Sequence, residues 1–264
     1  MRLLDLFSGI GGFALAAQKT FKEDLEIVGF CEIEDYARRV LSKNFPGVPI
    51  HEDICKMDGN NFKDIDLITG GFPCQDISIS GEGKGIKNGT RSGLWFELHR
   101  IISEVRPKFA LIENVPMLTR RGGTRVISDL TNIGYDCEWQ VISAAEIGAR
   151  HLRKRSWIVA SQTVSNTDSE RRCSRNTQRK NAENVRELQR GEEYGQRNFI
   201  KRLGRGFNGI SSWMDGSWEE GIPRVKEKQE NKTKRLTGLG NAIVPTNAQI
   251  IMEFIKPHIT QQEK

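Results

Sequence analysis

The chain has 264 residues, of which 37% are hydrophobic and 28% charged, a balance typical of a globular protein with one large domain, or one domain and a small lobe. No apolar run is long enough to cross a bilayer, and the segment after Met1 does not resemble a signal peptide, so we expect a cytoplasmic protein with no membrane partner. The five cysteines are odd in number and form no CxxC pair, which argues against a disulfide framework and predicts no bound metal.

Strand-like and helix-like segments alternate along the first part of the chain. Buried strands are predicted at Leu3–Phe7, Glu26–Cys31, Asp66–Thr69, Phe109–Glu113 and Trp157–Ala160. Helices are predicted at Ala14–Phe21, Asp35–Asn44, Leu94–Glu104 and Val126–Ile133. Such alternation builds βαβ units, so we expect an α/β fold with a largely parallel, doubly wound sheet of Rossmann type.

The composition changes after residue 161. Residues 163–198 are almost entirely polar or charged and predict a long flexible loop, whereas Phe207, Trp213 and Trp218 could build a small second lobe. A last helix is predicted at Thr246–Ile255. The chain is therefore divided into a first domain, a small and partly flexible region, and a C-terminal segment that folds back onto the first domain, at residues 1–161, 162–235 and 236–264.

Positive charge is concentrated in the second part of the chain. Residues 151–264 hold 22 Lys and Arg against 13 Asp and Glu, whereas residues 1–150 hold 18 against 21. This asymmetry indicates a polyanion held mainly by the second part, although a solvated basic surface explains it equally well.

A glycine-rich turn follows the first predicted strand. Gly9 and Gly11 would let the backbone approach a ligand, and Glu32 ends the next strand 23 positions after Gly9, where a carboxylate can accept both ribose hydroxyls of a nucleotide-like cofactor. Phe7 could stack on an adenine and Asp53 could accept from its amino group. The alternatives are a tight structural turn, a core phenyl ring and a solvated loop carboxylate.

A cysteine and a carboxylic acid follow two further strands. Cys74 comes directly after Pro73, and Glu113 ends the strand at 109–113, so both are expected at the carboxyl edge of the sheet. A thiolate beside an acid suits conjugate addition to a pyrimidine, with attack at C6 and hydrogen bonding at N3. The alternatives are a buried structural cysteine and a helix-capping glutamate.

Arg153 and Arg155 stand two positions apart before the last predicted strand. In an extended segment they point to one face, where one could hold the pyrimidine carbonyl and the other could brace the site or a phosphate. Taken alone, this run is more simply a solvated charge cluster.

Taken together, these blocks resemble the DNA (cytosine-5) methyltransferase family over nearly the whole chain. The agreement is specific because seven blocks occur in the family's usual order: DLFSGIGGF at 5–13, CEIE at 31–34, HEDI at 51–54, GGFPCQDIS at 70–78, ENV at 113–115, RKR at 153–155 and GLGNAIVP at 238–245. The family usually has Pro-Gln where Arg150 and His151 stand here, and we expect this departure to change one contact without abolishing activity.

The resemblance implies a role for each matching residue. Cys74 would be the nucleophile, Glu113 the partner of N3 and Arg155 the clamp on the pyrimidine O2, with Arg153 and Asn114 supporting the site. The S-adenosyl-L-methionine pocket would be lined by Phe7, Gly9, Gly11, Glu32, Asp53, Ile54, Pro73, Leu94 and Asn241.

The resemblance also implies the substrate and its recognition. The expected substrate is double-stranded DNA with an extruded cytosine, the basic glycine-rich segment 81–91 would close over the base, and residues 162–235 would choose the DNA sequence. We expect a monomer in the cytoplasm of a prokaryotic or phage-infected cell, and the sequence leaves open whether a restriction endonuclease accompanies it. The alternatives are a tRNA cytosine methyltransferase, a non-catalytic DNA-binding relative and, less well supported, a nicotinamide-dependent oxidoreductase.

Overall fold

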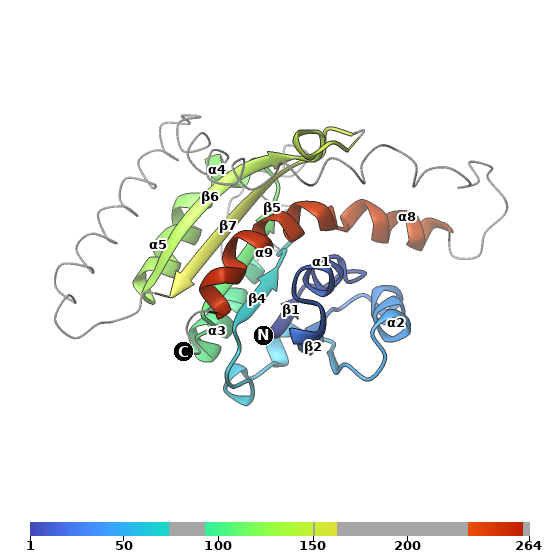
Figure 1. Cartoon of the computed structure of the whole chain (residues 1–264), viewed down its shortest axis with the longest axis horizontal. Helices are drawn as coiled ribbons and strands as arrows, with labels where there is room; N and C mark the ends of the chain where they lie inside the picture. Colours follow the sequence, from blue (N-terminus) through green and yellow to red (C-terminus); the bar gives the residue numbers. More distant parts are fainter. Residues whose placement is uncertain (74–92, 150, 163–231, 261–264) are drawn as a thin grey trace.

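The computed structural model describes residues 1–73, 93–149, 151–162 and 232–260, which build a layered α/β structure around one sheet (Figure 1). The seven strands are β1 (Arg2–Leu6), β2 (Glu26–Cys31), β3 (Ile50–His51), β4 (Leu67–Gly70), β5 (Phe109–Asn114), β6 (Tyr135–Ser143) and β7 (Lys154–Gln162). The helices are α1 (Gly12–Phe21), α2 (Asp35–Asn44), α3 (Leu94–Val105), α4 (Leu118–Arg121), α5 (Gly123–Asn132), α8 (Lys232–Asn241) and α9 (Pro245–Thr260). Short 3-10 turns lie at Lys22–Asp24, Ile54–Lys56, Gly59–Asn61 and Ala144–Ile147.

The sheet has the strand order β3-β2-β1-β4-β5-β7-β6. The first five strands of this order run parallel, whereas β7 runs antiparallel to both of its neighbours, β5 and β6. Because β7 is reversed, it begins at the edge where the parallel strands end. That edge therefore collects the residues that follow β1, β2, β4 and β5 together with those that open β7.

Side chains alternate between the two faces of the sheet, as the strand geometry requires. In β1, Leu4 and Leu6 join one apolar cluster with α3 and α5, whereas Leu3 joins a second cluster with α1 and α9. All three leucines are fully buried. The sheet is thus covered on both faces, which explains why its central strands are continuous apolar runs.

The C-terminal helix α9 packs against α1, far away in the sequence. Phe13 and Ala17 of α1 share a cluster with Ile251 and Ile255 of α9, and the Lys256 ammonium donates to a backbone carbonyl near the end of α1 at 2.8 Å. Burying each isoleucine contributes about 1.5–3 kcal/mol to stability. This contact anchors the end of the described chain on the first domain.

The expected fold class is confirmed, with differences in detail. Elements β3, β6, α4 and α8 were not predicted from the sequence, and β7 extends well beyond the expected 157–160. Helix α5 begins at Gly123 instead of Val126, and α8 begins at Lys232, before the expected boundary at 236. The expected second lobe lies mainly in residues 163–231, outside the described part of the chain.

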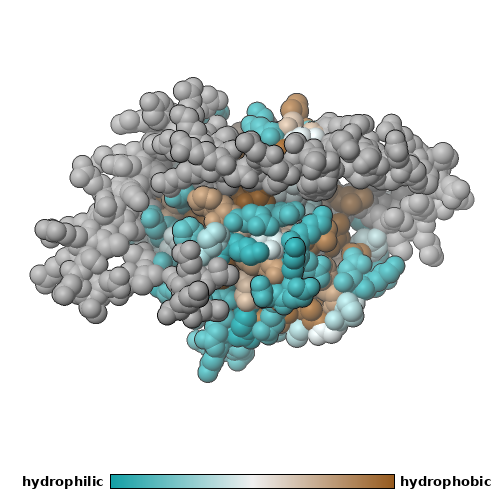
Figure 2. Space-filling model, viewed as in Figure 1, coloured by the Kyte–Doolittle hydropathy of each residue, from teal (hydrophilic) through white to brown (hydrophobic). Residues whose placement is uncertain are grey.

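The surface of the described part is mixed in character. Hydrophilic residues interrupt the hydrophobic ones over the face shown in Figure 2. Among the helices of the described residues, none is both long enough and apolar enough to pass through a bilayer.

Candidate active site

The turn after β1 has an unusual backbone conformation. Phe7 and Gly9 both have φ of 53° and Gly11 has φ of 89°, the left-handed region that favours glycine. A Cβ atom on Gly11 would lie 2.6 Å from Cε2 of Phe45, so only glycine lets α1 approach α2. A Cβ atom on Gly9 would meet nothing within 4 Å, so the described chain leaves open space beside this residue.

Glu32 holds this turn from the end of β2. Its Oε2 accepts from the backbone N–H of Gly9 at 2.7 Å, and its Oε1 accepts from that of Glu34 at 2.8 Å. The side chain is nearly buried, yet each carboxylate oxygen has a second lone pair. Glu32 can therefore stabilise the turn and also accept from a ligand hydroxyl group.

The Asp53–Ile54 segment follows β3 on the same side of the sheet. Asp53 is half-buried and accepts from the backbone N–H of Cys55 at 3.0 Å, and Ile54 is buried. Arg100 of α3, which the sequence analysis missed, donates to the carbonyl oxygens of Ile54 at 2.9 Å and Met57 at 3.0 Å. The position of this segment is therefore fixed from α3.

Ile33 is a second residue that the sequence analysis missed. It follows Glu32 directly, and 70% of its surface is exposed, which is unusual for a large apolar side chain. The signal in the sequence was a single isoleucine between two glutamates. It provides apolar surface beside the carboxylate that a flat, partly apolar ligand could cover.

Glu113 lies at the end of β5 and is 8% exposed. Nε of Arg155 lies 2.8 Å from its Oε1, and a Cβ atom on Gly71 would lie 3.1 Å from its Oε2. Burial raises the pKa of Glu113 to about 7, although the positive charges of Arg155 and Arg153 act in the opposite direction. A carboxyl group with this pKa holds its proton in about half of the molecules at neutral pH.

The segment that leads to Cys74 is fixed beside Glu113. Asn114 donates from Nδ2 to the carbonyl oxygen of Phe72 at 3.0 Å, and the Phe72 ring lies 5.5 Å from the ring of Trp95 in α3. The described part of this segment ends at Pro73, so Cys74 itself lies outside the described residues. The expected neighbourhood of Cys74 and Glu113 stays a prediction, and the contacts of Gly71 and Phe72 support it.

The buried cysteines of the described residues are poor nucleophiles. Burial raises the pKa of Cys31 to about 12, with the nearby Glu32 carboxylate adding to the effect, and burial also raises the pKa of Cys137. Both thiols are therefore protonated at neutral pH.

Arg153, the residue just before β7, and Arg155, in β7, have different partners. Arg155 faces Glu113, whereas Arg153 donates from Nη1 to the carbonyl oxygen of Gly240 at 2.9 Å and from Nη2 to that of Ala242 at 2.7 Å. Of the expected clamp Arg155 and the expected support Arg153, only Arg155 forms an ion pair with the Glu113 carboxyl group. His151 is exposed, and Arg150 lies outside the described residues.

Two further predicted cofactor residues are Asn241 and Leu94. Asn241 is exposed and stands between Gly238, where a Cβ atom would lie 3.3 Å from Cγ2 of Ile10, and Ile243, which packs on Gly12. Leu94 opens α3 and is half-buried against the core. The structure thus brings the glycine turn, Glu32 and the C-terminal residues together, with α3 supporting the Asp53–Ile54 segment from one side.

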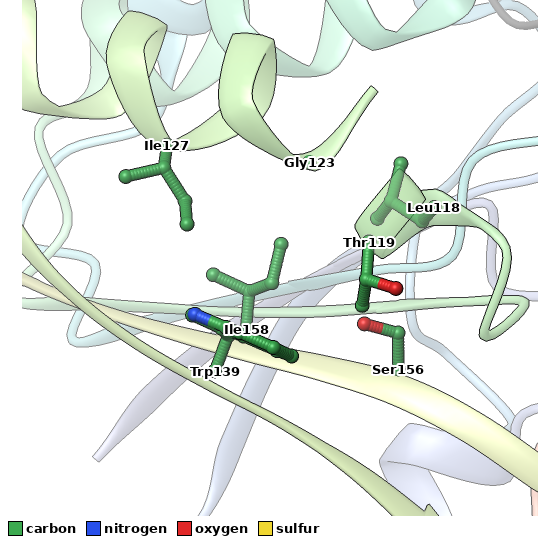
Figure 3. Close-up of a pocket in the computed structure, with 7 residues that line it drawn as sticks. All are labelled: Leu118, Thr119, Gly123, Ile127, Trp139, Ser156 and Ile158. Atoms are coloured by element: carbon green, nitrogen blue, oxygen red, sulfur yellow. The ribbon is translucent and has the colours of Figure 1, made fainter. Parts of the chain in front are cut away.

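A small, mainly apolar pocket lies elsewhere, between α4, α5 and the strands β6 and β7 (Figure 3). It is lined by Leu118, Thr119, Gly123, Ile127, Trp139, Ser156 and Ile158. Trp139 and Ile158 belong to the cluster on the α3 and α5 face, whereas Trp157, the β7 partner of Glu113, belongs to the opposite cluster. This pocket is therefore separate from the candidate active site. The described residues also contain no group of three or more His, Cys, Asp or Glu side chains able to hold a metal.

The chain is similar to several known proteins. It is 39% identical over 169 residues to the type II methyltransferase M2.BsuMI of Bacillus subtilis, which covers 61% of this chain and 42% of that protein. It is 32% identical over 163 residues to the type II methyltransferase M.HhaI of Haemophilus parahaemolyticus, which covers 60% and 48%. The matches therefore span about half the length of these relatives or less.

Solved structures show the same fold. The Dnmt2 methyltransferase of S. pombe matches with a TM-score of 0.53 and 24% identity over 64% of this chain and 54% of its own. The methyltransferase EhMeth of Entamoeba histolytica matches with a TM-score of 0.53 and 22% identity over 64% and 55%. The family model for C-5 cytosine-specific DNA methylases matches residues 1–239, and by this match the chain belongs to that family.

Proposed function

We propose that this chain transfers a methyl group from S-adenosyl-L-methionine to C5 of a cytosine in double-stranded DNA through a covalent adduct of Cys74. One observation carries the proposal. The buried Glu113 carboxyl group, paired with Arg155, lies against Gly71 and at the sheet edge that also holds the glycine turn and Glu32. The acid Glu113, the methyl donor bound at the glycine turn and the segment that leads to Cys74 would thus lie at one edge of the sheet.

The glycine turn fits S-adenosyl-L-methionine better than a dinucleotide. The open space beside Gly9 admits a ligand, Glu32 offers free lone pairs for two ribose hydroxyls, and Ile33 offers apolar surface for the adenine. The turn itself contains no lysine or arginine, which suits a cofactor without phosphate groups. When bound there, this cofactor supplies an electrophilic methyl group and leaves as S-adenosylhomocysteine.

The residues of the chain would then carry the following steps. The Cys74 thiolate forms a bond to C6 while the proton of Glu113 passes to N3, so that the electron pair of the C5–C6 double bond becomes available at C5. C5 takes the methyl group. A base removes the C5 proton, the bond to Cys74 breaks, and the N3 proton returns to Glu113. Arg155 holds the pyrimidine O2 and compensates the negative charge that Glu113 acquires when its proton has passed to N3.

The burial of Glu113 implies how the base is reached. A carboxyl group that is 8% exposed cannot contact a cytosine stacked in a duplex, so the base must leave the helix. The segment 81–91 is proposed to cover the extruded base, and the basic residues of 162–235 to bind the DNA, both outside the described residues apart from 162 and 232–235. The names of the type II relatives suggest, as a proposal for this chain, a restriction endonuclease acting on the same site.

The test is a transfer assay with labelled S-adenosyl-L-methionine, supplied with duplex DNA or tRNA. We expect label in DNA at C5 of cytosine, and a denaturation-resistant complex with DNA that carries 5-fluorocytosine, because the fluorine cannot leave C5 as a cation. Cys74→Ala should abolish both signals. Label in tRNA alone would support the tRNA enzyme instead, and an adduct that persists in Cys74→Ala would remove Cys74 as the nucleophile.

A further inference from the structure

The Arg153 guanidinium makes a contact that the expected reaction at the cytosine does not require. Its guanidinium donates to two carbonyl oxygens, those of Gly240 and Ala242, across a sequence separation of more than 80 residues. Gly240 lies in the last turn of α8, where carbonyl groups have no partner within the helix and a positive charge is favoured. From its position just before β7, Arg153 therefore caps the C-terminal end of α8.

The capped residues lie directly on the glycine turn. A Cβ atom on Gly12 would lie 2.6 Å from Cγ1 of Ile243, and one on Gly238 would lie 3.3 Å from Cγ2 of Ile10. These two contacts stand on either side of the residues that Arg153 holds. The segment 238–243, which we call the C-terminal block, is thus fixed to the turn by packing and to the residue just before β7, Arg153, by hydrogen bonds.

We propose that Arg153 is a positioning residue for the cofactor, which it serves by holding the C-terminal block on the glycine turn. The proposal rests on the proposed function, because the turn is assigned there to S-adenosyl-L-methionine. Arginine suits the task because its planar fork reaches two carbonyl oxygens at once, whereas a lysine ammonium has no such fixed geometry. The guanidinium also lies close enough to Glu113 to lower its pKa, so one side chain connects the catalytic acid with the cofactor site.

The first test compares Arg153→Met with Lys154→Met, a matched control at the next residue, the first of β7, whose side chain is exposed. We expect Arg153→Met to raise the calorimetric Kd for S-adenosyl-L-methionine about tenfold and to speed backbone hydrogen exchange within 238–243. Lys154→Met should change neither, and Arg153→Lys should be intermediate. A purely structural role would lower Tm but leave Kd and local exchange in the folded protein as in the wild type, and that outcome overturns the proposal.

A second variant keeps the test decisive if Arg153→Met does not fold. Gly12→Ala should displace Ile243 and give the same rise in Kd and in exchange, and adding Ile243→Ala should restore both by removing the clash. Backbone hydrogen exchange within 238–243 that stays at the wild-type rate in Gly12→Ala would contradict the contact between Gly12 and Ile243. If the wild type does not bind S-adenosyl-L-methionine, the proposed function fails, while the exchange experiment still decides whether Arg153 holds the block.

Discussion

The Arg155 guanidinium lies 2.8 Å from the Glu113 carboxylate, and the two residues come from adjacent strands that run in opposite directions. A cation this close lowers the pKa of a carboxyl group, and Arg153 acts the same way. Burial outweighs both, so that the pKa of Glu113 is raised to about 7. Without the arginines the group would stay protonated to still higher pH, and without burial it would be fully ionised at neutral pH.

The first prediction concerns Glu113 and pH. Because the pKa is raised to about 7, the proton available for N3 is present below pH 7 and is lost as the pH rises through 7. The wild-type rate of methyl transfer should therefore have an alkaline decline that is absent in Glu113→Gln, with the variant slower by about 10²–10⁴-fold. Single-turnover assays across this range measure both effects. Glu253→Gln, an exposed change on α9, serves as control, and a decline that persists in Glu113→Gln would assign it to another group.

The second prediction concerns Glu32. Glu32→Ala removes the acceptor for the Gly9 and Glu34 backbone N–H groups and for the proposed ribose hydroxyls, so we expect a loss of about 1–3 kcal/mol in cofactor binding. Calorimetric titration with S-adenosyl-L-methionine measures it. Glu34→Ala is a matched control, because only its backbone contacts Glu32 and its side chain is exposed. Equal affinities for the two variants would remove Glu32 from the cofactor site.

The third prediction concerns Asp5, which is fully buried in β1. Burial raises its pKa from 3.8 to about 7, the hydrogen bond from Thr69 at 2.7 Å lowers it, and the charge of Glu32 raises it. The unfolded chain releases this proton near pH 4 and the folded chain near pH 7, so the free energy of unfolding falls as the pH rises between these values. The slope from this group is about 1.4 kcal/mol per pH unit.

Asp5→Asn should remove this contribution to the slope. Glu113, whose pKa is also raised, contributes in the same direction, so the double variant with Glu113→Gln should be flatter still. Urea unfolding at several pH values between about 4 and about 7 measures the slopes. An unchanged slope in Asp5→Asn would mean that Asp5 titrates normally.

The fourth prediction concerns Trp95, which is fully buried and donates from Nε1 to Asp129 of α5 at 2.8 Å. Trp95→Phe keeps an aromatic ring near Phe72 but loses this hydrogen bond, so we expect a loss of about 1–3 kcal/mol in the free energy of unfolding. Arg125→Ala removes the ion pair of an exposed guanidinium with Asp129 and its contact with the Phe96 ring, and should cost less than about 1 kcal/mol. If urea unfolding gives both variants the same loss in the free energy of unfolding, the buried hydrogen bond of Trp95 contributes no more than the exposed contacts of Arg125.

The fifth prediction concerns residues 162–235, which we propose to choose the DNA sequence. Replacing this interval with the matching one from a related enzyme of known specificity should transfer that specificity, because base-edge contacts would come from the interval. Bisulfite sequencing of DNA from expressing cells reads the modified sites. An active chimera that still modifies the original sites would place recognition elsewhere, in the segment after Cys74.

The sequence was sufficient to predict the elements that are buried on both faces. Continuous apolar runs mark the central parallel strands, and the glycines and Glu32 follow such strands at the expected spacing. Strand β6 was missed because it lies at the edge of the sheet, where Tyr135, Cys137 and Trp139 alternate with more polar residues instead of forming a run. That period of two is itself a strand signal.

Contacts between distant segments could not be predicted in the same way. Nothing near Arg153 in the sequence indicates that its partners are Gly240 and Ala242, and nothing near Arg100 indicates Ile54 and Met57. A backbone carbonyl accepts hydrogen bonds whatever its side chain, so such partners leave no mark in the residue types. The direction of β7, which brings Arg155 to Glu113, also follows from how the strands pair rather than from their composition.

The pairing of β7 also makes the distance between Arg155 and Glu113 independent of the length of the segment that follows β7. β7, which precedes residues 163–231, is hydrogen-bonded to both β5 and β6. Helix α9, which follows these residues after α8, packs against α1. The described segments before and after residues 163–231 are therefore attached to the sheet or to its helices. Residues can be added or removed between these two anchors without moving Arg155 away from Glu113. Residues 163–231 could therefore be replaced as a unit during evolution while Arg155 and Glu113 keep their positions.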